Sequence, residues 1–176
     1  MVDVNLAGLL RHEVWIERPE VRMVAGDVAV ARGVRQEGLV RVLVRPLDAR
    51  ETAGLLGRLE EARYAVYMTA AEDVAEGDVL AQRVWVTRLA EAAAEGTREL
   101  RVEEALARPG EEIEVGGESG VLAGVVDEVV SLAEGLEERH EAGCEVVGVR
   151  RFEVLGVEDE GGQGHHWRVL VRPRVV

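Results

Sequence analysis

The sequence predicts an α+β fold, in which a small antiparallel β-barrel or sandwich carries one capped helix and a mostly helical acidic insertion. Segments near both ends alternate apolar and charged residues, which is typical of half-buried strands. A helix-start signature lies between them, and the block after it is rich in Ala and Glu. We therefore expect a β core of residues 1–87 and 143–176, and an insertion of residues 88–142.

The first half of the core is expected to be mainly strands. Residues 12–18 alternate, and Pro19 should end their pairing because proline has no N–H for the ladder. Residues 21–34 hold two apolar stretches around Gly26-Asp27, which predicts a hairpin. Further strands are expected at residues 39–45, 64–68 and 79–86.

One helix is predicted over residues 49–62. Asp48 and Glu51 stand in the spacing of a capping box, in which each side chain satisfies a backbone N–H at the start of the helix. Apolar residues then recur on one helical face: Leu55, Leu56 and Leu59.

The insertion is expected to be mainly helical. Residues 88–95 are rich in alanine, and residues 97–108 fit helix or strand equally well. Residues 113–115 predict a short strand. A later apolar stripe steps by 3, 4, 3 and 4, which favours a helix ending near Gly143. The stripe consists of Leu122, Val125, Val129, Leu132 and Leu136, and it could also hold a dimer together.

The chain closes on a second predicted hairpin. Residues 146–157 and 165–172 both alternate, and the glycine-rich residues 161–164 between them cannot continue a helix. A phosphate-binding loop is not expected there, because a strand follows and no Lys-Ser/Thr pair is present.

Three short motifs give the chain a family resemblance. They are Leu9-Leu10-Arg11-His12 leading into a strand that stops at Arg18-Pro19, Tyr64-Ala65-Val66-Tyr67 followed by Asp73-Val74-Ala75-Glu76-Gly77-Asp78, and Phe152-Glu153-Val154-Leu155-Gly156-Val157. In these motifs the chain resembles the small head-closure and head–tail connector proteins of tailed bacteriophages. The acidic insertion is where the resemblance fails.

The resemblance implies a structural protein of the virion neck, made in the host cytoplasm. Such proteins form homo-oligomeric rings, often twelve- or sixfold, with the portal or adaptor protein on one side and the tail tube or terminator protein on the other. DNA would pass through the channel without sequence-specific binding. Residues 1–11 and 173–176 would be tie points of the assembly. A tail-terminator or tail-completion ring is the alternative within this class.

The charge is acidic and unusual in kind. The 176 residues are 47% hydrophobic and 31% charged, and the net charge is −13. All 21 basic residues are arginine, a bias that a GC-rich genome or a thermophile would explain. Residues 88–141 carry 15 acidic residues against five arginines, a net charge of −10. This balance argues against a general nucleic-acid binder.

A candidate interface gathers on the strands. It comprises Arg41, Arg45, Arg150, Arg151, His165, His166, Trp167, Arg168, Arg172 and Arg174. These arginines could pair with glutamates within the chain or between subunits. Alternatively, they could form a basic face that meets the acidic insertion of a neighbouring subunit, as a head-to-tail ring requires.

Catalytic and metal-binding patterns are weak. No nucleophile elbow or lysine is present, and Cys144 is alone, so it is expected to be a small buried hydrophobe. We expect no enzyme activity, no cofactor and no metal. The alternative from another class is a small cytosolic binding module or metal-dependent enzyme of a thermophile that uses His165 and His166. No 18-residue apolar run is present, so no membrane contact is expected.

Overall fold

The computed structural model describes residues 10–24, 27–159 and 165–174, and it is mostly β, with 55% strand and 7% helix. The strands are β1 (His12–Val24), β2 (Asp27–Arg35), β3 (Val40–Pro46), β4 (Tyr64–Thr69), β5 (Val79–Arg88), β6 (Glu99–Arg101), β7 (Glu112–Val115), β8 (Glu118–Val126), β9 (Val129–Leu132), β10 (Glu145–Asp159) and β11 (His166–Pro173). The two helical segments are α1 (Ala49–Ala53) and the 3-10 helix η2 (Gly57–Glu61).

The chain folds into two compact units. Unit 1 comprises residues 1–82 and 151–175, and unit 2 comprises residues 83–150. Both units are built from strands, so the predicted α+β class with a mostly helical insertion is wrong. The alanine- and glutamate-rich composition favoured a helix, but packing of valines on a sheet prevailed over that weak preference.

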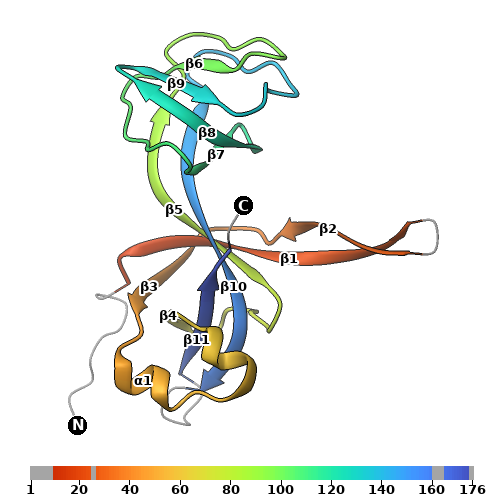
Figure 1. Ribbon diagram of the computed structural model, residues 1–176, viewed down its shortest axis with the longest axis vertical. Helices are drawn as coiled ribbons and strands as arrows, with labels where there is room; N and C mark the ends of the chain where they lie inside the picture. The colour runs from red at the N-terminus through yellow and green to blue at the C-terminus, as the bar shows by residue number, and fades with distance from the viewer. Residues whose placement is uncertain (1–9, 25–26, 160–164, 175–176) are drawn as a thin grey trace. The chain divides into compact units, whose positions relative to one another are not determined.

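Unit 1 contains a closed six-stranded barrel. Its strands follow the order β11-β4-β3-β1-β5-β10, and pairing of β10 with β11 closes the ring (Figure 1). The closing hairpin predicted from the sequence is present, with Glu158 opposite Arg168 and Val154 opposite Val171. The barrel core consists of Val14, Ile16, Val42, Val66, Met68, Leu80, Phe152, Val154, Val169 and Val171.

Strands β1 and β2 form the predicted hairpin, but it is longer than expected. The expectation that pairing would end at Pro19 is wrong, because β1 continues to Val24 and pairs with β2 as far as Asp27. The register shifts between Arg18 and Glu20. A bulge therefore accommodates the proline, which needs no ladder partner there.

Helix α1 begins as predicted but ends early. Asp48 accepts hydrogen bonds from the amides of Arg50 and Glu51, and the Glu51 side chain returns a bond to the Asp48 amide, so the capping box is confirmed. The expected helix over residues 49–62 is wrong after Ala53. The chain is already extended at Leu56, with φ −127° and ψ 150°, and a 3-10 helix begins at Gly57, whose φ of 60° lies outside the right-handed helical region.

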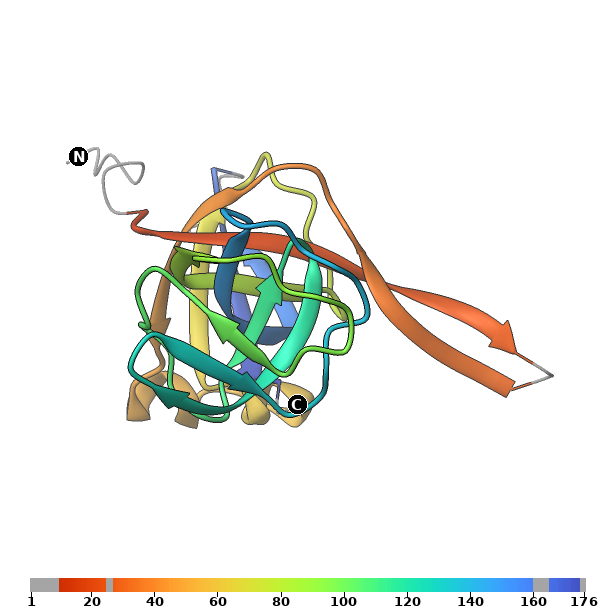
Figure 2. The ribbon, with the colours of Figure 1, turned by 90° about the horizontal axis from the view of Figure 1, so that it is seen from above.

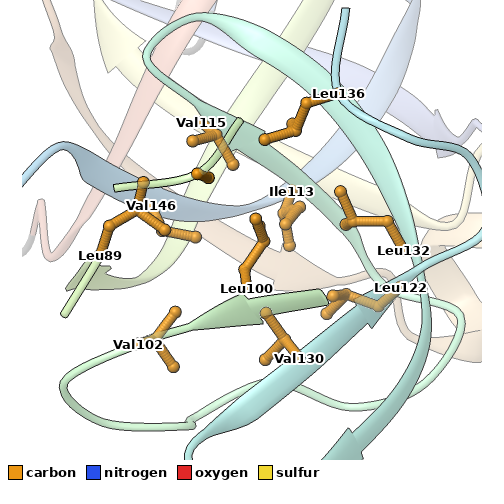
Figure 3. Packing of buried hydrophobic residues seen from close by; sticks show 11 residues of the cluster. Leu89, Leu100, Val102, Ile113, Val115, Leu122, Val130, Leu132, Leu136 and Val146 are labelled. Atoms are coloured by element: carbon orange, nitrogen blue, oxygen red, sulfur yellow. The ribbon is translucent and has the colours of Figure 1, made fainter. Parts of the chain in front are cut away.

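Unit 2 is a small sheet over its own apolar core. The strand order is β10-β7-β8-β9-β6, and the buried cluster consists of Leu89, Ala93, Leu100, Val102, Ile113, Val115, Leu122, Val130, Leu132, Leu136 and Val146 (Figure 3). The predicted strand at residues 113–115 is present within β7. Residues 88–95 form no helix. Their backbone instead makes isolated bridges, Leu89 with Val102 and Ala93 with His140.

Four residues of the predicted helical stripe lie on a β-hairpin, and the fifth, Leu136, lies in the segment after β9. Leu122 pairs with Leu132 across β8 and β9, and Val126 pairs with Val129. Asp127 has a φ of 52° in the two-residue turn, as hairpin turns of this length require. The 3–4 spacing arose from two short strands joined by a turn and a bulge. Leu122, Leu132 and Leu136 are buried within the unit, so no helical zipper presents them to a second copy.

Parts of three predictions lie outside the described residues. These parts are residues 1–9 and 175–176 at the ends, the turn at residues 25–26, and the glycine-rich loop at residues 160–164. In the rest of the chain, no helix has the length and apolar character needed to cross a bilayer.

Candidate functional site

The hairpin of β1 and β2 is the most distinctive feature of unit 1. Its outer part, residues 20–24 and 27–31, is here called the arm; Figures 1 and 2 show it running away from the barrel. Toward its tip, both views show no other described strand of unit 1 beside it. Each barrel strand is paired on both sides, so the arm holds the open edges among the described strands of unit 1.

A glycine at the foot of the arm allows the bulge. A Cβ at Gly33 would lie 2.8 Å from the backbone oxygen of Arg18 and 2.9 Å from its carbonyl carbon. The two strands therefore cross too closely for a side chain at this position. Gly33 and the Pro19 bulge together set where the arm leaves the barrel.

A buried ion pair fixes the strand just before the bulge. The Glu17 carboxylate accepts hydrogen bonds from Arg151 on β10 at 3.0 Å and from Arg35 on β2 at 2.8 Å. Both Glu17 and Arg151 are buried. Burial raises the pKa of Glu17, but the hydrogen bonds from the two guanidinium groups outweigh it and hold the pKa below its ordinary value. Arg35 also stacks 4.2 Å from the centre of the Trp15 ring.

A second clamp ties the arm base to the loop before β5. Arg18 donates to both oxygens of the buried Asp78 at 3.0 and 2.9 Å, and to Asp73 at 3.1 Å. The Gln36 side chain donates to the Asp73 carbonyl, and the Gln36 amide donates to Ile16. These bidentate, charge-assisted contacts hold the foot of the arm on the barrel.

Two of the predicted interface arginines are held by one glutamate. Arg45 donates to both carboxylate oxygens of Glu51, and Arg168 donates to one of them at 3.0 Å. Arg168 also pairs with Glu158, and Arg45 bonds the Tyr67 hydroxyl at 2.9 Å. Hydrogen bonds from Arg45 and from the Asp48 amide lower the pKa of Glu51 to about 2. These arginines therefore anchor α1 on the barrel.

The remaining predicted arginines divide into paired and exposed ones. Arg151 is buried against Glu17, and Arg172 pairs with Glu153 and Glu61. Three others have exposed side chains: Arg41, Arg150 and Arg174. Of the two predicted alternatives, pairing within the chain therefore holds for Arg45, Arg151, Arg168 and Arg172. The other three arginines are exposed on the surface.

The predicted histidine pair lies at the start of β11. The rings of His165 and His166 are 6.4 Å apart between centroids, and Trp167 donates to the Glu72 carbonyl at 3.3 Å. In the described part of the chain, no three His, Cys, Asp or Glu side chains are grouped as metal ligands. Cys144 is partly buried against the unit 2 core.

Sequence reasoning missed the residues that hold the arm. These residues are separated from their partners by up to 134 residues, so no local pattern connects them. They are Glu17, Arg18, Arg35 and Asp78. The Arg18-Pro19 pair was the available signal, but it indicated the end of a strand instead of a bulge within one.

A scan against protein-family models finds no match, and a search of the curated proteins finds none either.

Proposed function

We propose that this chain is a structural ring protein of a bacteriophage neck, which joins the portal-bearing capsid to the tail and helps to close the DNA channel. The observation that carries the proposal is the arm, whose edges remain open on a barrel that has no other open edge among its described strands. The described residues of the three motifs that resemble head–tail connectors lie on and just before β1, on β4 with the loop after it, and on the part of β10 after Arg150, which all belong to unit 1.

An arm of this kind favours assembly on physical grounds. A two-stranded ribbon is marginally stable alone in water, and open strand edges pair readily with other strands. The outer edge of β1 in one copy and that of β2 in the next are different surfaces of the same chain. Pairing them is a heterologous contact, which closes into a ring when the rotation between copies allows it.

The firm base suits this role. The Glu17–Arg151 and Arg18–Asp78 contacts fix the direction in which the arm leaves the barrel. A fixed direction reduces the entropy lost on assembly, so each copy presents its edges ready for the next. The net charge of −13 further supports a channel protein that DNA passes without sticking.

The test is the mass of the purified chain across concentration, by light scattering with negative-stain imaging. The decisive variant replaces residues 19–33 by Asn-Gly, a two-residue turn that joins Arg18 to Val34, which already pair. Rings of the unaltered chain, alone or with portal or tail components, and loss of rings in the truncated chain are the expected result.

A matched control removes apolar surface without touching the arm. Leu56→Ser changes the most exposed large hydrophobic side chain among the described residues, at 79% exposure. It should assemble like the unaltered chain. Absence of rings under every condition, or rings from a truncated chain with an unchanged circular dichroism spectrum, would refute the proposal. Binding to tail-tube components but not to portal would indicate a tail terminator instead.

A further inference from the structure

Unit 2 carries a groove that is lined by its own residues. It has a volume of about 370 Å³ and lies between β8 and the segment after β9. Its apolar part is formed by Val121, Leu132 and Leu136. Four carboxylates also line it: Glu112, Glu118, Glu134 and Glu137.

Of these four carboxylates, Glu112 and Glu118 have interaction partners, and the other two are free of ion pairs with the described residues. Glu118 accepts hydrogen bonds from His140 at 2.9 Å and from the amides of Glu137 and Glu138. Burial raises the pKa of Glu118, but these hydrogen bonds outweigh it and keep the carboxyl ionised at neutral pH. The Glu134 and Glu137 side chains are exposed and form no ion pair with any described residue.

The lining determines what the groove can take. The described residues along it include no arginine, and Glu134 and Glu137 carry negative charge that no ion pair with a described residue neutralises. An apolar floor beside carboxylates suits a group with an apolar body and a cationic end, because neither part is then left unmatched. An exposed leucine next to an arginine has this chemistry.

Unit 1 presents such a pair. Leu39 is 39% exposed, and Arg41 follows two residues later with an exposed side chain. Leu39 immediately precedes β3, and Arg41 is the second residue of that strand. Within the described residues Arg41 forms no ion pair, whereas Arg45 on the same strand is bound to Glu51.

We infer that the groove of unit 2 in one copy receives Leu39 and Arg41 of a second copy. Charge complementarity supports this occupant: residues 83–150 carry 16 acidic residues against seven arginines, and Arg41 is a cation without an ion pair among the described residues, close in sequence to the exposed Leu39. The contact joins two different patches, so it extends from copy to copy. It rests on the proposed function, for which it supplies a second contact between neighbouring subunits.

The test uses sedimentation velocity on the full chain. The double substitution Glu134→Arg with Glu137→Arg reverses the two free charges of the groove. The single substitution Arg41→Glu reverses the charge of the occupant. The matched control, Glu91→Arg with Glu95→Arg, changes the net charge equally at exposed positions of unit 2 that do not line the groove. Each test variant alone should associate at least about tenfold more weakly, and the control should not.

Mixing separates this inference from the proposed function. The Arg41→Glu copy keeps a groove, and the groove variant keeps Leu39 and Arg41, so an equimolar mixture should form a one-to-one complex through one restored contact. No restored complex, or equal weakening by the control, would overturn the inference. Rings that persist in both test variants would overturn it while leaving the neck proposal standing. Arg41-dependent association that never closes into rings would do the reverse.

Discussion

Glu17 and Arg151 form a buried ion pair at 3.0 Å although 134 residues separate them in the chain. Glu17 lies on β1 just before the arm, and Arg151 lies on β10, on the opposite side of β5 in the strand order. A third group, Arg35, shares the carboxylate from β2. The pair therefore joins the arm to the barrel through three strands.

Glu17→Gln should destabilise the protein by about 3 kcal/mol, because it leaves the Arg151 charge buried without its counter-charge. Urea denaturation followed by circular dichroism measures the change. Glu37→Gln is the control, since Glu37 is exposed, and it should change the free energy of unfolding by less than about 0.5 kcal/mol. Equal effects of the two variants would show that the pair does not hold the base.

Glu51 predicts a specific dependence of stability on acid. Its pKa is about 2 in the folded chain against an ordinary value of 4.5, so the carboxylate stabilises the fold fully above pH 4.5. That contribution disappears as the pH falls through about 2. The melting temperature of Glu51→Gln should therefore lie below that of the unaltered chain at pH 7, and the gap should close on acidification. A gap that is constant with pH would contradict the assignment.

Gly33→Ala should disturb the foot of the arm. The new methyl would lie 2.8 Å from a backbone oxygen that cannot rotate away, which costs about 1–3 kcal/mol. Gly54→Ala is the matched control, because the nearest atom to its added Cβ is 3.7 Å away. It should be neutral or slightly stabilising. Thermal denaturation of both variants checks this, and a neutral Gly33→Ala would indicate that the two strands are further apart.

Leu132→Ala should destabilise unit 2, and it should not act by dissociating a helical dimer. Leu132 is 4% exposed within the unit 2 core, so truncation should cost about 2–5 kcal/mol. Tryptophan fluorescence reports the change, since Trp85 packs against the same cluster. Val126→Ala on the same hairpin, at 71% exposure, should cost less than about 0.5 kcal/mol. Dissociation of a dimer with unchanged unfolding would contradict the burial of Leu132 within one copy.

Much of unit 1 was readable from local patterns. Alternation around Val14 and Ile16 predicted a strand, and the Asp48–Glu51 spacing predicted a helix start that the structure confirms. Both signals depend on neighbours within a few residues. The length of the helix could not be predicted in the same way, because the helix ends at Ala53 and the chain is extended at Leu56, although the spacing of Leu55, Leu56 and Leu59 fits a helical face.

By itself, the sequence determined the strand segments of the barrel, the capping box and the position of the first hairpin. Only the tertiary structure decided that the barrel closes, that β1 continues past Pro19, and that the stripe from Leu122 to Leu132 lies on strands. A spacing of 3 and 4 fits one helix or two strands joined by a turn, and cross-strand packing makes the choice. The partners of Glu17 and Arg18 were also known only from the structure, because ion pairs between distant strands produce no periodic pattern in the sequence.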